Sequence, residues 1–278
     1  MPPRGRWSSV SAVSAADAAE RLLGRRAAVV RRLSGGDLSQ IFHLTLQDGG
    51  TLIAKQAPGA EVEADMLRAI RAAGAPAPAV LAANGEWLLM EAVAGGEPVS
   101  GAWPDLARSL GHLHAMTGTE YGWPVDHAFG LVGIDNRPAA DWPAFWAERR
   151  LLCHLPFVGP ELGRRIERLA ARLPDHLPRR PAASLLHGDL WGGNVLVADG
   201  GVAALIDPAC YHGDREVDAA MLTLFDRPPP SFFDALVLDP GWEGRQPIYR
   251  LWPLLVHLRL FGDSYAGSAG AALEAMGC

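Results

Sequence analysis

The segment His187–Asn194 (HGDLWGGN) constrains the fold more than any other part of the sequence. A short apolar run, Val195–Val197, follows it directly, and a second apolar run, Val202–Ile206, ends at Asp207. Asp199–Gly201 separates the two runs, and an Asp-Gly pair in this position is typical of a tight β-hairpin turn. The pattern predicts a hairpin whose open end brings Asp207 next to the last residue of the segment.

Asp189, Asn194 and Asp207 together match the needs of phosphoryl transfer. One carboxylate must orient and deprotonate the attacking hydroxyl group, while an amide and a second carboxylate hold Mg²⁺ on the phosphates of ATP. The spacing D-x-x-x-x-N followed by a later Asp is that of the kinase catalytic loop. We therefore predict Asp189 as the catalytic base and Asn194 and Asp207 as metal ligands. The alternative is a loop in which these residues only form turns.

Two departures from the protein-kinase pattern narrow this prediction. The usual H-R-D is replaced by His187–Asp189, with glycine in the middle, and the usual D-F-G is replaced by Asp207–Ala209, with proline in the middle. The missing Arg and Phe indicate a small-molecule phosphotransferase rather than a protein kinase regulated by an activation loop. No G-x-x-x-x-G-K-[ST] sequence occurs, which argues against a P-loop kinase.

The region before residue 94 has the pattern of a sheet with one helix. Ile41–Leu46 alternates apolar and polar residues, a turn sequence follows, and Thr51–Lys55 is the expected returning strand. Glu61–Ala73 carries apolar residues at helical spacing, and Trp87–Met90 is a further short apolar strand. A short amphipathic helix is expected over Ala15–Leu23.

Lys55 and Glu63 are the candidate nucleotide-binding residues of this region. A kinase uses a strand lysine on the ATP phosphates and a helix glutamate that positions it, so we predict an ion pair between the two. The alternative is a solvated lysine and an exposed glutamate. Gly35 and Gly36 are predicted to cover phosphate with backbone N–H groups, although such a pair is also an ordinary turn. The adenine is expected near Met90, Glu91, Ala92 and Val93.

Beyond Ala94-Gly95-Gly96, which we interpret as a linker, the chain has mainly helical patterns. Helices are expected over Trp142–Leu155, Pro160–Leu173 and Pro247–Phe261, the last with a break at Pro253. The predicted fold is α+β and two-lobed, like that of protein kinases. It has a flexible N-terminus (1–14), a β-rich nucleotide-binding lobe (15–93) and a larger helical lobe (94–278) for catalysis and substrate binding.

Composition excludes several other classes of protein. The chain has 278 residues and a formal net charge of −6, which argues against a basic nucleic-acid binder. Its three cysteines are widely spaced, which argues against a disulfide framework or a zinc site. No signal-peptide core and no apolar stretch long enough to span a membrane occur. We expect a cytoplasmic monomer whose partners are ATP and a small-molecule or protein-bound substrate.

Several residues around the loop have more than one interpretation. His187 is expected to support the backbone around Asp189 or to touch substrate. Trp191 is expected to form a wall of the acceptor site. Asp214, Glu216 and Asp218 form an acidic cluster that either favours an amine-bearing acceptor or braces the loop, and a helix N-terminal turn is an equally good explanation. His257 and the other helix histidines are expected to pack rather than to bind ligands.

These motifs resemble the fructosamine kinases (ketosamine-3-kinases). The segment HGDLWGGN is similar to the family's catalytic loop, in which a Trp follows the Asp by two residues. Ile206–Met221 resembles its long metal-site signature. The likeness extends from about Leu33 to Tyr265 and includes further blocks at Gly133–Asn136, Trp142, Phe145, Glu148–Leu151, His257 and Leu260–Gly262. Gly192 stands where the family usually has Ser, and Asp37 where some members carry a redox-active Cys.

The resemblance implies an ATP- and Mg²⁺-dependent kinase that phosphorylates the third carbon of sugars attached to amines by glycation. The family's unstable product is lost from the amine, so the implied role is deglycation repair. Two alternatives remain open. One is another small-molecule kinase, of the aminoglycoside or choline type, since these share the H-G-D-x-x-x-x-N element. The other is a non-catalytic nucleotide-binding scaffold.

Overall fold

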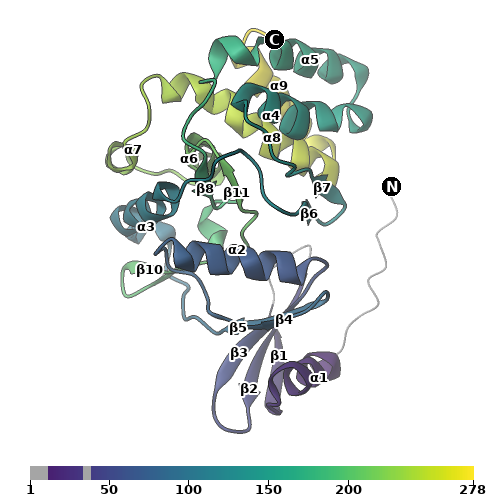
Figure 1. Cartoon of the computed structure of the whole chain (residues 1–278), viewed down its shortest axis with the longest axis vertical. Coiled ribbons are helices and arrows are strands. Elements are labelled where there is room, and N and C mark those ends of the chain that lie inside the picture. Colours follow the sequence, from purple (N-terminus) through teal and green to yellow (C-terminus); the bar gives the residue numbers. More distant parts are fainter. Residues whose placement is uncertain (1–11, 34–38) are drawn as a thin grey trace. The chain divides into compact units, whose positions relative to one another are not determined.

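The computed structural model describes residues 12–33 and 39–278, which divide into two compact units (Figure 1). The first unit consists of the residues up to Arg68 together with Pro78–Val93, and the second of Ala69–Ala77 and Ala94–Cys278. Gly35 and Gly36, expected to cover phosphate, lie outside the described residues, as does the stretch 1–11 of the expected flexible N-terminus.

The first unit is built on an antiparallel five-stranded sheet with the strand order β1-β2-β3-β5-β4. Its strands are β1 (Ala27–Leu33), β2 (Gln40–Leu46), β3 (Thr51–Gln56), β4 (Val80–Ala83) and β5 (Trp87–Glu91). The strands predicted from alternation and apolar runs correspond to β2, β3 and β5. The edge strands β1 and β4 lack that signal because their side chains are mostly half-buried or exposed.

Helix α1 (Ala12–Leu23) packs its small residues against one face of this sheet, and it begins three residues earlier than expected. The shared core comprises Ala15, Ala18, Ala19, Phe42, Leu44, Leu46, Leu52, Ala54, Trp87 and Leu89. Because successive strand residues point to opposite faces, Lys55 points away from the core that its neighbour Ala54 joins. The second helix of the region, α2 (Ala60–Ala72), follows β3 after a short turn.

The second unit is mainly helical. Its longest helix, α8 (Trp242–Phe261), begins five residues before the expected start and is not broken at Pro253, contrary to our expectation. The residues around Pro253 are buried on nearly all sides, and that packing offsets the helix-breaking cost of proline, about 3 kcal/mol. The other helices are α3 (Trp103–Ala115), α4 (Trp142–Trp146), α5 (Pro160–His176), α6 (Glu216–Phe225), α7 (Pro230–Leu236) and α9 (Ala266–Ala275), with short 3₁₀ turns at Val99–Gly101 and Asp263–Tyr265.

The single helix predicted over Trp142–Leu155 is instead divided into three parts. After α4, one π-helical turn spans Ala147–Leu151, and 3₁₀ turns cover Leu152–Phe157. Pro156 lies inside the 3₁₀ segment, where its missing N–H and its clash with the carbonyl group four residues earlier disfavour an α-helix. The core beside this region is rich in aromatic residues, among them Trp142, Trp146, Tyr211, Tyr249 and Trp252.

Short strand pairs position the loops of the second unit. The predicted hairpin is confirmed as β9 (Val195–Ala198) paired antiparallel with β10 (Gly201–Leu205). Asp199 and Gly200 both have positive φ, which is the two-residue turn expected for such a hairpin. A second pair joins β8 (Ser184–Leu186) to β11 (Tyr211–Gly213), and a third joins β6 (His127–Phe129) to β7 (Val132–Ile134).

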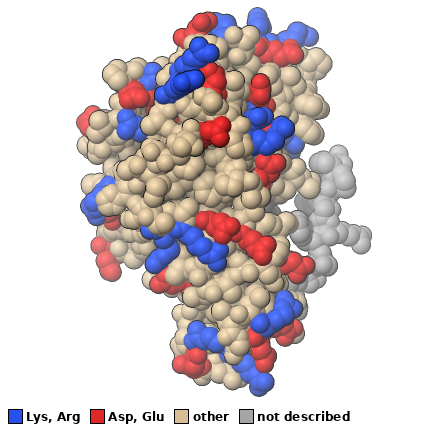
Figure 2. Space-filling view, viewed as in Figure 1, with Lys and Arg blue, Asp and Glu red and all other residues tan. Residues whose placement is uncertain are grey.

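On the face of the molecule seen in Figure 2, Lys and Arg side chains lie interspersed with Asp and Glu. Among the helices of residues 12–33 and 39–278, none combines the length and the apolar character that crossing a bilayer requires.

Candidate active site

The open end of the hairpin brings the predicted catalytic residues together. The amide group of Asn194 donates hydrogen bonds to the carbonyl oxygen of Asp189 at 2.8 Å and to its carboxylate at 3.1 Å. The backbone N–H of Ile206 donates to the carbonyl oxygen of Asn194 at 3.0 Å. Asp207 directly follows Ile206 and therefore lies near Asn194. The carboxylates of Asp189 and Asp207 and the amide of Asn194 are thus gathered at the open end of the hairpin.

Backbone geometry at this loop explains two of its residues. Gly188 has a φ of 80°, and a Cβ atom there would lie 2.1 Å from the carbonyl oxygen of Ala209, so only glycine fits. Asp207 has a φ of 52°, in the left-handed region that Asp tolerates better than most residues. The glycine that replaces the protein-kinase arginine is thus required by the close approach of the segment that follows Asp207.

His187 supports the backbone on both sides of the site. Its Nε2 lies 3.0 Å from the carbonyl oxygen of Ile206, and its Nδ1 accepts from the backbone N–H of Asp189 at 3.3 Å. The ring is fully buried, and burial lowers its pKa. A neutral ring protonated at Nε2 satisfies both bonds. Because both nitrogens are engaged inside the protein, we do not retain His187 as a substrate contact.

The buried carboxylate of Asp218 fixes the segment before Asp189. It accepts from the backbone N–H groups of His187 and Gly188, each at 2.9 Å, and from the Nε2 atom of His114 at 2.9 Å. Burial acts to raise the pKa of Asp218, but the hydrogen bond and charge of His114 outweigh it and hold the pKa below its usual value. The charge is thereby stabilised without solvent. Asp218 belongs to the acidic cluster for which bracing of the loop was one interpretation, whereas His114 was expected only to pack, and no local sequence signal links the two.

The other two members of the acidic cluster also have partners within the protein. Asp214 accepts from the hydroxyl group of Tyr249 at 2.7 Å, and that hydroxyl accepts from Trp142 at 2.9 Å. Glu216 forms a two-pronged ion pair with Arg245, at 2.6 and 2.8 Å. Both carboxylates are buried, so they brace the start of α6 and are not retained as contacts to an acceptor. Burial and, after it, the charge of Glu216 raise the pKa of Asp214 to about 7.

Trp191 is the exposed aromatic side chain of the loop. The residue is 40% exposed, and its ring packs edge-on against Phe225, with centroids 5.8 Å apart. A Cβ atom on Gly193 would lie 2.2 Å from the Trp191 ring, so this glycine makes room for it. Phe225 in turn packs on His257 at 5.5 Å, which places that histidine in the same aromatic row. The next loop residue, Gly192, donates its N–H to Asp226 at 2.7 Å.

In the first unit, the ion pair predicted between Lys55 and Glu63 is confirmed at 2.7 Å. Both side chains are largely buried, at 8% and 6% exposure. Burial of one charge without the other is unfavourable, so each residue requires its partner. Met90 and Glu91 end β5, and Ala92 and Val93 follow as the last residues of this unit.

Comparisons with known proteins identify the family. A family model described as fructosamine kinase matches residues 9–276. A probable ketoamine kinase of Enterococcus faecium is 35% identical over 202 residues, which cover 69% of this chain and 72% of the relative. A probable ketoamine kinase of Staphylococcus aureus is 30% identical over 270 residues, covering 87% and 91%.

Solved structures show the same fold. A candidate fructosamine-3-kinase from Thermobifida fusca superposes with a TM-score of 0.86 at 32% identity, covering 94% of this chain and 98% of that one. An aminoglycoside phosphotransferase in complex with AMP-PNP and hygromycin B gives a TM-score of 0.67 at 18% identity, covering 94% and 96%, which is a likeness of fold alone. The predicted α+β, protein-kinase-like fold is thus confirmed. The chain belongs to the fructosamine kinase family and is a phosphotransferase of that fold.

Proposed function

We propose that the protein is an ATP- and Mg²⁺-dependent kinase that phosphorylates the 3-hydroxyl group of ketosamines, the sugar adducts formed on amines by glycation. The observation that carries the proposal is the direct contact of Asn194 with Asp189 beside Asp207. Family membership supplies the class of acceptor. Loss of the phosphorylated sugar from the amine would make this activity a deglycation repair.

Asp189 is the proposed general base. Its carboxylate must lie about 2.6–3.2 Å from the reacting hydroxyl, accept the proton and align the oxygen for attack on the γ-phosphate of ATP. The Asn194 amide donates to one carboxylate oxygen of Asp189, and His187 accepts from the backbone N–H of Asp189. Both bonds restrict the carboxylate to one orientation before substrate arrives.

Asn194 and Asp207 fit the donor set of a hard cation. The amide nitrogen of Asn194 is engaged with Asp189, which leaves its carbonyl oxygen Oδ1 as the donor, and Asp207 supplies a carboxylate. Oxygen donors of this kind suit Mg²⁺. When bound there, the ion would neutralise the charge that develops on the transferred phosphate. Lys55, held by Glu63, is proposed to contact phosphate, and Met90–Val93 to border the adenine.

The acceptor is proposed to be a ribulosamine in preference to a fructosamine. Trp191 offers an exposed ring face beside Asp189 that suits the apolar face of a sugar. Its position two residues after Asp189, on the same loop, supports the proposal that the ring borders the acceptor. The protein is expected to act as a cytoplasmic monomer, and size-exclusion chromatography would test the oligomeric state.

A panel of acceptors tests the proposal. Purified protein is incubated with MgATP and, separately, with ribulosyl-lysine, fructosyl-lysine, kanamycin and choline, and products are identified by mass spectrometry. We expect phosphate on the ketosamines, with the highest kcat/KM for ribulosyl-lysine. Transfer to kanamycin or choline without transfer to any ketosamine would contradict the acceptor and retain the kinase. No transfer, together with tight ATP binding, would indicate a scaffold.

A further inference from the structure

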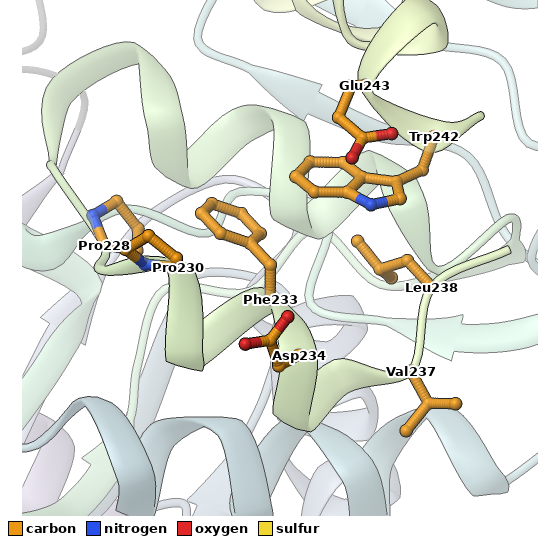
Figure 3. A pocket seen from close by; sticks show the side chains of 8 residues that line it. All are labelled: Pro228, Pro230, Phe233, Asp234, Val237, Leu238, Trp242 and Glu243. Atoms are coloured by element: carbon orange, nitrogen blue, oxygen red, sulfur yellow. The ribbon is translucent and has the colours of Figure 1, made fainter. Parts of the chain in front are cut away.

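A pocket of about 460 Å³ lies between α7 and the first turn of α8 (Figure 3). Its aromatic part is formed by Phe233 and Trp242, whose rings stack with centroids 4.8 Å apart and an angle of 23° between their planes. Leu238 adds an aliphatic surface beside them. A volume in this range, lined by apolar and aromatic groups with a few polar ones, is usual for a site that takes one small ligand or side chain.

The charged residues among those that line the pocket are both acidic, Asp234 and Glu243. Within the described ranges of the chain, neither carboxylate forms an ion pair. Two other acids of the second unit are paired, Asp239 with Arg215 and Glu216 with Arg245. The pocket therefore presents uncompensated negative charge next to an aromatic surface, which favours a cation on an apolar stem.

Val237 adds an independent sign that the pocket is used. It follows α7 with a φ of 50°, in the left-handed region, where a β-branched residue is a genuine outlier. Helices that end in this conformation usually place Gly or Asn at that position. Its side chain lines the pocket and is 71% exposed, so burial does not repay the strain. Backbone strain retained at an exposed side chain points to a contact made with a ligand.

The chain itself links the pocket to the catalytic loop. Asp226 accepts from the N–H of Gly192 at 2.7 Å, and two residues later Pro228 lines the pocket. Gly192 is three residues from Asp189. At 3.3–3.6 Å per residue, and with the Asp226 side chain and its hydrogen bond included, the pocket edge lies within roughly 25 Å of Asp189, a span that about seven residues of extended polypeptide cover.

We propose that this pocket binds a lysine or arginine side chain of a polypeptide, within about seven residues of the glycated lysine that the enzyme modifies. The aliphatic stem packs on Phe233, Trp242 and Val237, and the charged end lies near Asp234 and Glu243. This inference rests on the proposed function, because it assigns protein-bound ketosamines as substrates and gives them a sequence preference.

The test compares three acceptors: free ribulosyl-lysine, a ribulosylated peptide with one flanking arginine, and the same peptide with serine in its place. The enzymes are wild type, the double variant Asp234→Asn/Glu243→Gln, and the control Glu161→Gln/Asp175→Asn, which removes two exposed acids of α5. We expect wild type and control to prefer the arginine peptide about tenfold in kcat/KM. The double variant should lose that preference while keeping its activity on free ribulosyl-lysine.

Val237→Gly sharpens the test, because it relieves the backbone strain and removes the apolar side chain. We expect a melting temperature no lower than that of wild type, together with a higher KM for the arginine peptide alone. Equal use of the arginine and serine peptides by wild type would overturn the inference.

If wild type phosphorylates no ketosamine, the proposed function fails instead. Titration calorimetry with the unglycated arginine peptide then decides the pocket separately. A Kd about tenfold weaker for the double variant than for the control supports the inference, and the absence of binding to wild type rejects it.

Discussion

Lys55 in the first unit and Asp189 in the second are held in place by very different sets of residues. Lys55 has an ion-pair partner only eight residues along the chain. Asp189 lies in a loop whose backbone is fixed by Asp218, which accepts from the N–H groups of residues 31 and 30 positions earlier. Asp218 is in turn hydrogen-bonded to His114, 104 positions earlier. The ion pair in the first unit thus joins residues close in the sequence, whereas the support of the Asp189 loop comes from distant elements of its unit.

The largest effect on turnover is expected from removing the carboxylate of Asp189. Asp189→Asn keeps the size of the side chain but removes the proposed general base, so kcat should fall by about 10²–10⁴ while ATP binding is largely unchanged. Steady-state kinetics with the preferred ketosamine and calorimetry with MgATP measure the two quantities. The matched control is Asp199→Asn, because Asn also tolerates the positive φ of that hairpin turn. Activity within a few-fold of wild type would remove Asp189 from the mechanism.

The second prediction tests how far the local pair acts alone. Lys55→Met leaves Glu63 charged and buried, which should cost about 3–5 kcal/mol of stability by denaturant unfolding. Lys55→Met/Glu63→Leu removes both charges and should recover most of that stability without recovering activity. If the double variant stays as unstable as the single one, the pair is not the reason for the loss. Recovered activity would instead rule out a role for Lys55 on phosphate.

The sequence predicted the contacts between residues that are close along the chain better than the contacts between distant residues. The spacing of Lys55 and Glu63, the hairpin turn and the order of Asp189, Asn194 and Asp207 are short-range signals, and the corresponding contacts are present. The sequence located the acidic cluster at residues 214–218 but did not separate its members.

That separation depends on side chains contributed by distant helices. Tyr249 and Arg245 on α8 pair with Asp214 and Glu216, and His114 on α3 pairs with Asp218. Hydrophobic periodicity predicts which face of a helix is buried, but it does not predict which other helix packs against that face. The edge strands β1 and β4 were missed for a related reason, since their exposed residues carry no alternating pattern.

The third prediction addresses the long-range support of the loop. The wild-type carboxylate of Asp218 accepts from three donors. In Asp218→Asn the new amide NH₂ group faces one of these donors and cannot accept from it. A buried donor left without a partner costs about 1–3 kcal/mol. We expect a lower kcat with nearly unchanged KM for ATP, because the change displaces the loop and not Lys55 or Met90–Val93, the residues of the first unit proposed to contact ATP.

Asp218 acts through the backbone, so it is a positioning residue, and His114→Gln provides the sharper test. Gln retains an N–H donor for Asp218, so it should recover more kcat than His114→Ala. Equal kcat in the two His114 variants would show that the hydrogen bond at this position is unimportant for turnover.

The smallest expected effect concerns the pH dependence of stability. The pKa of Asp214 is raised from 3.8 to about 7, first by burial and then by the charge of Glu216. Between about pH 4 and pH 7 the folded protein therefore binds more protons at this carboxyl group than the unfolded chain does. Because stability rises with pH only where the unfolded state binds more protons, this group makes stability fall as pH rises through that window.

Asp214→Asn removes this proton uptake. Tyr249 retains a partner in the variant, since its hydroxyl oxygen can accept from the new amide as it now accepts from Trp142. Urea unfolding at half-unit steps from pH 4 to pH 8 should show a smaller decline of stability with pH in the variant than in wild type. Asp175→Asn, on an exposed turn of α5, controls for the loss of one negative charge and should keep the wild-type slope. Parallel curves for wild type and Asp214→Asn would mean that Asp214 is ionised throughout the window, with Tyr249 and Arg245 compensating its burial fully.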